Sequence, residues 1–254
     1  MEQQLWFAAQ KGKVGEVRRL LETHGRINVN WRDQFGWTVL HIACASDREF
    51  VLPLLLVHPD LDMNQRNDLE GTAFTLACRS GSACCIRLLV RDSRVSINER
   101  DHEGYTTLFH VLLYGRLDTI KWMIACGKPL DLGEPGNPRT DAIGNAIKVG
   151  WVEAADLLNR FRMSPAQIRE EVRRDLGYYR ELAVNLFALV IFVSDGLLQP
   201  KALEGDHRTR FFAMAIRLPL ELQMILCYRG VGSLKTVILT ADSETAFQNL
   251  SRLV

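Results

Sequence analysis

Cysteine and histidine are the side chains that most often hold metals or act as nucleophile and base, and this chain has six of each. The cysteines form no CxxC pair, and the adjacent Cys84 and Cys85 do not have the spacing of a zinc site. The sequence also contains no P-loop glycine-lysine pattern, no GxSxG elbow and no HExxH motif. We therefore expect free, buried thiols in a reducing compartment, and no metal or cofactor.

Two pairs of side chains could be imagined as an acid and a base: Asp141 with Asn145, and Asp195 with Glu221. Carboxylates scattered along a chain are more often solvated or used to cap helices. No residue is marked by its surroundings as a nucleophile. We therefore expect a protein that is not an enzyme.

The charges of the chain are balanced, with 31 Lys and Arg against 30 Asp and Glu in 254 residues, a formal charge of +1. A nucleic-acid partner normally requires a basic face, so we expect none. The first four residues are polar and carry no basic cluster, which is unlike a secretory signal. We expect a cytoplasmic protein, with the nucleus as the alternative.

Two residue types recur at a fixed interval of 34 residues and show that the chain is built from repeats. The threonines are Thr38, Thr72 and Thr106, and the asparagines are Asn30, Asn64 and Asn98. Such an interval predicts one supersecondary unit that is stacked several times, because a single unit cannot bury its own apolar face. Hydrophobic residues make up 47% of the chain, which is enough for a continuous core.

The segments that begin at the three threonines read T-V-L-H-I-A at 38–43, T-A-F-T-L-A at 72–77 and T-T-L-F-H-V at 106–111. They resemble the T-P-L-H-x-A signature of the ankyrin-repeat family, whose repeats each form a β-turn and two antiparallel helices. The resemblance implies that His41, in the histidine slot, ties the loop of one repeat to the next.

A glycine that ends the first helix of each repeat is a second mark of this family. Gly12, Gly81, Gly115 and Gly150 fill that slot, and Asp47 takes the missing place. Five repeats can then be assigned, at about 3–30, 31–64, 65–98, 99–132 and 133–163. Turn-forming residues at 133–138 replace the usual hairpin sequence in the last repeat.

The repeat period stops at Ser164-Pro165, where a new helix is predicted to begin. Residues 179–198 are predicted to form a helix that is apolar on nearly every side, interrupted by Asn185, and we expect it to be a bundle core and not a membrane span. Further helices are expected at 209–218, at 220–228 and from about 242. The sequence thus predicts an all-α protein: an ankyrin-repeat solenoid at 1–163 followed by a small helical bundle at 164–254.

Ankyrin proteins leave certain positions variable, and the resemblance implies that these line the concave face and the hairpin tips. In this chain several of them hold large apolar or aromatic groups, which dominate binding when they are desolvated. We expect a non-enzymatic scaffold that binds a partner protein, although the rings could instead fold back on a hairpin or be covered by the bundle. The predicted binding residues are Gln34, Phe35, Trp37, Leu69, Arg79, His102, Tyr105, Leu113 and Tyr114.

The segment near 218–228 begins L-P-L-E-L and resembles the start of an F-box, which recruits a cullin ubiquitin ligase through its adaptor. This is the alternative function: a substrate adaptor of such a ligase. The match is short, because residues 230–233 depart from the F-box pattern. A third reading, an unrecognised enzyme in the bundle, would require a polar pocket with converging charged groups.

Overall fold

The computed structural model describes residues 1–23, 27–114, 116–194, 215, 220–230 and 246. The chain divides into two compact units, Met1–Val172 and Arg173–Val254. The described residues are helical apart from turns, loops and two isolated β-bridges in the hairpin loops. The predicted all-α class is therefore confirmed.

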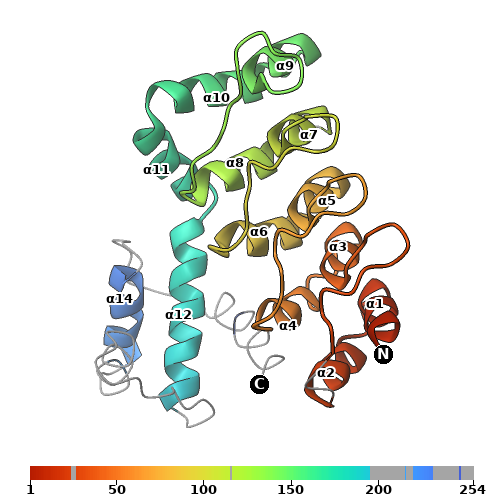
Figure 1. The fold of residues 1–254 in the computed structure, drawn as a ribbon. Coiled ribbons are helices and arrows are strands. Elements are labelled where there is room, and N and C mark those ends of the chain that lie inside the picture. Colours follow the sequence, from red (N-terminus) through yellow and green to blue (C-terminus); the bar gives the residue numbers. More distant parts are fainter. Residues whose placement is uncertain (24–26, 115, 195–214, 216–219, 231–245, 247–254) are drawn as a thin grey trace. The chain divides into compact units, whose positions relative to one another are not determined.

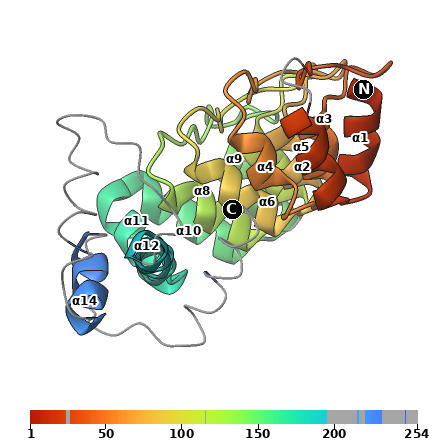
Figure 2. The ribbon, with the colours of Figure 1, turned by 90° about the horizontal axis from the view of Figure 1, so that it is seen from below.

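The helices of the first unit stack in two rows (Figure 1). The first row holds α1 (Glu2–Gln10), α3 (Val39–Ala45), α5 (Ala73–Ser80), α7 (Thr107–Leu113) and α9 (Ala142–Val149). The second row holds α2 (Val14–Thr23), α4 (Leu52–Leu56), α6 (Ala83–Arg91), α8 (Leu117–Ala125) and α10 (Val152–Met163). Each first-row helix contacts the next one in its row and its own second-row partner. Figure 2 shows the loops between successive pairs along one side of the stack.

The recurring threonines begin the first-row helices. The side-chain oxygens of Thr38, Thr72 and Thr106 accept a hydrogen bond from the backbone N–H three residues later. This N-cap bond satisfies a donor that a helix start would otherwise leave without a partner. In the last pair Asp141 does the same for α9, because its Oδ1 accepts from the N–H of Gly144 at 2.8 Å.

One apolar ladder runs through the second row. The sequence predicts that its five members, which follow the helix-ending slot at a fixed distance, face the core. They are all buried, each at most 1% exposed: Leu20, Leu55, Leu89, Met123 and Leu158. Neighbouring repeats therefore complete each other's core, as a stacked architecture requires.

The recurring asparagines hold consecutive repeats together. Asn30 donates from Nδ2 to the carbonyl of Asp60 (2.6 Å) and accepts at Oδ1 from the N–H of Asp62 (2.9 Å). Asn64 makes the same pair of bonds with Arg94 (2.7 Å) and Ser96 (2.7 Å) in the following repeat. An amide side chain is needed at this place, because it supplies a donor and an acceptor together.

Helix α11 (Pro165–Asp175) packs on the last repeats of the first unit. Arg169 Nε donates to the carbonyl of Ile124 at 3.1 Å, and Arg160 reaches both carboxylate oxygens of Glu171 at 2.6 Å. Helix α11 thus contacts α8 and α10 of the second row. The structural division falls inside α11, after Val172, and the domain boundary after residue 163 stays a prediction.

The second unit contains α12 (Tyr178–Ser194) and α14 (Leu220–Gly230), which contact each other. Its core is formed by Ala183, Val184, Phe187, Ala188, Val190, Ala215, Cys227, Tyr228 and Ala246. Asn185, the polar interruption in α12, is exposed. No helix among the described residues is long and apolar enough to cross a membrane. The helices expected at 209–218 and from about 242 lie largely outside the described residues.

Candidate functional site

The hairpin tips are shaped by an Asp or Asn at the start of each loop. Asp33 Oδ1 accepts from the N–H groups of Phe35 (2.9 Å) and Trp37 (2.8 Å), and Asn67 repeats this arrangement in the next loop. The loop is thereby folded by its own side chain. The N–H of Asp68 donates to the carbonyl of Phe35 at 3.2 Å, so neighbouring tips are joined.

Seven of the nine predicted binding residues are exposed: Gln34, Phe35, Leu69, Arg79, His102, Leu113 and Tyr114. The other two, Trp37 and Tyr105, are half-buried. Trp37 lies beside the buried His41 with ring centroids 6.4 Å apart, and Tyr105 stacks on Phe109 at 4.4 Å. Both rings thus pack partly on the first-row helix of their own repeat, Trp37 on α3 and Tyr105 on α7.

The predicted residues do not form one cluster. Phe35 and Leu69 stand on successive hairpin tips, and the ring of His102 joins the third tip to them through a 3.0 Å contact between Nδ1 and the carbonyl of Leu69. Leu113 and Tyr114 stand elsewhere, at the end of α7. The structure therefore places the exposed apolar residues of this set in two groups, one on the tips and one at the end of α7.

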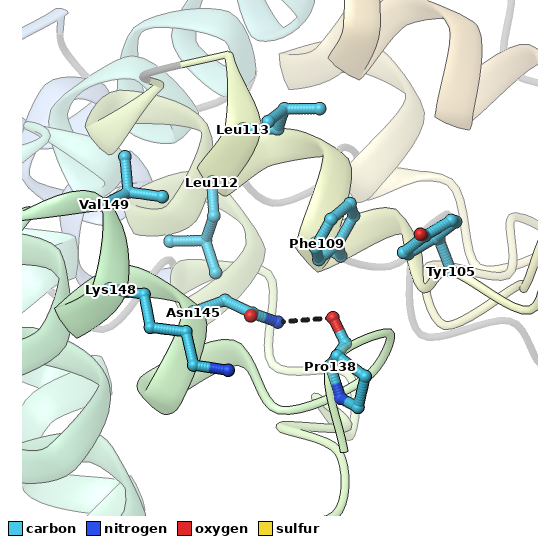
Figure 3. A pocket seen from close by; sticks show the side chains of 8 residues that line it. All are labelled: Tyr105, Phe109, Leu112, Leu113, Pro138, Asn145, Lys148 and Val149. Carbon is cyan, nitrogen blue, oxygen red and sulfur yellow. Dashed lines mark hydrogen bonds between the residues drawn. The ribbon is translucent and has the colours of Figure 1, made fainter. Parts of the chain in front are cut away.

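A groove of about 290 Å³ lies between the last two repeats (Figure 3). It is lined by Tyr105, Phe109, Leu112, Leu113, Pro138, Asn145, Lys148 and Val149. The hairpin and α7 supply the aromatic and leucine side chains, and α9 with its preceding loop supplies the other four. Only Tyr105 and Leu113 of this set are among the predicted binding residues.

Two of the missed residues could have been found from the repeat pattern. Lys148 and Val149 are the two residues before Gly150, which is the slot that holds Leu113 and Tyr114 one repeat earlier. Pro138 carries no such signal, because the loop before α9 has no counterpart in the other repeats, and Asn145, inside α9, fills no slot marked by the repeat pattern.

Phe109, which lines the groove, stands in the histidine slot of the repeat signature. In the second repeat His41 fills that slot and is buried, accepting at Nδ1 from the N–H of Thr38 (3.0 Å) and contacting the carbonyl of Gly71 through Nε2 (3.2 Å). This confirms the expected tie between consecutive loops. Burial lowers the pKa of His41 to about 4, so the ring is neutral at pH 7.

In the fourth repeat the histidine is displaced by one position. His110 Nε2 lies 2.7 Å from Asp101 Oδ2, while the ring of Phe109 faces the groove. Burial acts to raise the pKa of the Asp101 carboxyl, but hydrogen bonds, chiefly with His110 and Tyr105, outweigh it and leave that pKa below its usual value. The Asp101–His110 pair thus holds the hairpin without reaching into the groove lining.

The loop before α9 is organised by Asp141. Its Oδ2 accepts from the N–H of Gly136 at 2.7 Å, and its Oδ1 caps the helix. Burial acts to raise the pKa of Asp141, but the N–H groups of Gly136 and Gly144 and the charge of Lys148 outweigh it, so that pKa is lowered. Asn145 Nδ2 donates to the carbonyl of Pro138 at 3.0 Å, as Figure 3 shows.

The candidate acid/base pairs have other places in the structure. Asp141 caps a helix and Asn145 holds a loop carbonyl, while Asp195 and the side chain of Glu221 lie outside the described part. Among the described residues no group of three or more His, Cys, Asp or Glu could hold a metal. The cysteines are free; Cys44, Cys78, Cys85 and Cys227 are buried, but Cys84 and Cys126 are partly exposed. Binding through apolar contacts is the chemistry that the described groove supports.

The stacked helix pairs, the threonine caps and the looped tips define an ankyrin solenoid, and the family comparison agrees. The family model for ankyrin repeats (3 copies) matches residues 2–67 and 51–134. The two matches together span more than half of the 254 residues, so this chain belongs to the ankyrin-repeat family. Ankyrin repeats are generally protein–protein interaction modules, and the family is typically non-enzymatic. No curated protein matches the chain.

Proposed function

We propose that this protein is a non-enzymatic scaffold that binds a partner protein through the first-row helices and hairpin tips of its repeats. The observation that carries the proposal is the exposure of large apolar side chains at positions free of structural duty. Phe35 is 61% exposed, Leu69 53%, Leu113 54% and Tyr114 44%. Exposed apolar side chains that stand in groups, as Phe35 with Leu69 on the tips and Leu113 with Tyr114 at the end of α7, mark an interaction surface more often than scattered ones do.

The test is capture of a native partner by the full chain. Truncating an apolar anchor at the centre of an interface costs about 2 kcal/mol or more, so the Leu113→Ser and Tyr114→Ser double variant should lower capture at least ~10-fold. The matched control is Val57→Ser with Met163→Ser, two exposed apolar residues that do not line the groove. Quantitative mass spectrometry after affinity purification measures both.

Undiminished capture by a folded Leu113→Ser and Tyr114→Ser variant would remove the first-row helices from the proposal. The same comparison with Phe35→Ser and Leu69→Ser tests the hairpin tips separately. If both double variants keep the partner, the repeats bind it elsewhere or not at all.

The alternative, a cullin-ligase adaptor, stays a prediction. Leu218 and Pro219, the first residues of the F-box-like segment, lie outside the described residues. The rest of that segment belongs to α14, which buries Cys227 and Tyr228 in the core of the second unit. Copurification of a cullin adaptor with the full chain would support this function.

We propose that the protein is located in the cytoplasm, with the nucleus as the alternative.

A further inference from the structure

The groove between α7 and α9 has the size of a side-chain pocket. Its volume of about 290 Å³ lies at the lower limit of the ~300–1,000 Å³ range typical of small-molecule and cofactor sites. Its walls are apolar: the stacked rings of Tyr105 and Phe109, then Leu112, Leu113 and Val149. One bulky apolar side chain would desolvate these walls, which makes a short anchor the best-fitting occupant.

The rim of the groove is cationic. Lys148 lines it and is exposed, and the guanidinium of Arg139 lies over the ring of Tyr105 at 5.9 Å from its centroid. Neither cation has an ion pair with a carboxylate among the described residues, and no acidic residue lines the groove. The positive charge is therefore available to a ligand.

The nearby carboxylates make no ion pair with this rim. The charges of Asp141 and Lys148 attract each other, but the two oxygens of Asp141 accept hydrogen bonds from the N–H groups of Gly136 and Gly144. Glu103 lies beside His102, with 3.8 Å between Oε1 and Nε2. A carboxylate on the ligand would thus meet two cations and no repelling side chain of the groove lining.

An acceptor for a peptide backbone is also present. Asn145 uses its Nδ2 to hold the carbonyl of Pro138, and its Oδ1 has no hydrogen bond among the described residues. A main-chain N–H of an extended segment could donate to that oxygen. A nucleic acid is a poorer fit, because two cations beside an apolar wall do not make the continuous basic face that a phosphate backbone requires.

We propose that this groove receives a peptide segment of the partner in which a bulky apolar side chain stands within two residues of an aspartate or glutamate. The apolar side chain fills the space between α7 and α9, and the acidic side chain meets Lys148 and Arg139. The inference rests on the proposed function and adds to it the chemistry of the recognised segment.

The experiment selects peptides from a phage-displayed library of random dodecapeptides on the immobilised full chain. Fluorescence anisotropy then measures the affinity of the enriched peptides. We expect enrichment of Phe, Trp, Leu, Ile or Met beside Asp or Glu, and affinities that fall as NaCl rises from 50 to 500 mM. Enrichment of uncharged or basic peptides, or of none, overturns the inference.

The charge contact is tested by exchange. Lys148→Glu should weaken binding of the selected acidic peptides at least ~10-fold and strengthen binding of the same peptides with Lys in place of the acid. Lys11→Glu, which reverses an exposed charge in the first repeat, should leave both affinities unchanged. The inference is wrong if Lys148→Glu and Lys11→Glu act alike.

The apolar contact is tested by Val149→Ser, with Val57→Ser as its control. Only Val149→Ser should weaken peptide binding. Combined with Lys148→Glu, so that the rim and the wall are both changed, it should weaken binding at least ~10-fold. The two proposals fail in different ways. Loss of partner capture in the Leu113→Ser and Tyr114→Ser variant, combined with selection of peptides that lack the acid, keeps the scaffold function and rejects the acidic segment.

Discussion

The neutral state of His41 is the residue-scale feature with the clearest consequence. The ring is 1% exposed, and its Nδ1 accepts a hydrogen bond from the N–H of Thr38 at 3.0 Å. The hydroxyl oxygen Oγ1 of Thr38 lies 2.8 Å from the same Nδ1. A proton on Nδ1 would remove the lone pair that accepts from the N–H. The folded protein therefore disfavours protonation of the His41 ring, whereas the unfolded chain allows it.

Stability should therefore fall as the pH falls. Between the unfolded pKa of 6.5 and the folded pKa of about 4, the unfolded chain binds one more proton at His41, so the free energy of unfolding rises with pH across that window. At pH 5 the loss relative to pH 7.5 is ~2 kcal/mol. Urea unfolding at the two pH values measures it.

Comparison of variants isolates this contribution from that of the carboxylates. His41→Asn should be less stable at pH 7.5 but should lose ~2 kcal/mol less between pH 7.5 and 5, since it has no imidazole to titrate. Asn185→Ala, which changes an exposed side chain without a titratable group, should keep the slope of the original protein. Equal slopes for His41→Asn and the original protein would contradict the assignment.

Among the elements, the loop before α9 contains two glycines whose conformation the fold requires. Gly133 and Gly136 both have positive φ, at 76° and 83°, a conformation that costs other residues free energy. Their surroundings differ. A Cβ at Gly133 would overlap the backbone carbonyl of the buried Thr140, whereas at Gly136 there is no heavy atom within 4 Å.

Alanine at the two glycines should therefore have unequal effects. Gly136→Ala carries only the backbone cost, ~1 kcal/mol, while Gly133→Ala must also displace Thr140 and should cost ~3 kcal/mol or more. Thermal unfolding of the full chain compares them. If the two variants have the same melting temperature, the expected overlap between a Cβ at position 133 and Thr140 is wrong.

The sequence predicts the elements that repeat far better than the one that does not. The spacing of Thr38, Thr72 and Thr106, with the signature that each one begins, was enough to identify the repeats, because both signals can be seen in the sequence. The groove could not be predicted in the same way. Part of its far wall is Pro138, in a loop without a counterpart, and Asn145 of α9 is joined to that loop by its hydrogen bond to the carbonyl of Pro138. No local pattern predicts where such a loop folds.

At the scale of the whole molecule, the asparagine series shows how polar side chains join units that are otherwise held by packing. The spacing is visible in the sequence, but its reason is not. Asn98 completes the series, donating to the carbonyl of Pro129 at 2.8 Å and accepting from the N–H of Asp131 at 3.1 Å. Each of the three amides thus spans the boundary between two repeats.

Removing one of these ties should lower the stability of the stack. Asn64→Ala loses both bonds to the next repeat and should cost about 1–2 kcal/mol, because the groups are only partly shielded from water. Asn64→Asp keeps the acceptor, so its free energy of unfolding should lie between those of the original protein and Asn64→Ala. Asn185→Ala, on the exposed side of α12, is the control and should change the free energy of unfolding by less than ~0.5 kcal/mol. Equal losses for the two alanine variants would refute the role of the tie.

The last tie of the series lies beside the groove. Asn98 precedes α7, and its partners Pro129 and Asp131 precede α9, so this amide joins the two loops that lead into the helices lining the groove. The next place in the 34-residue interval is Leu132, whose side chain can neither donate nor accept a hydrogen bond, so the series stops there. A pair of hydrogen bonds tolerates small changes of separation less well than dispersion contacts do. The separation of the two groove-lining repeats is thus fixed at the base of their loops, and a ligand meets a groove whose width is already set.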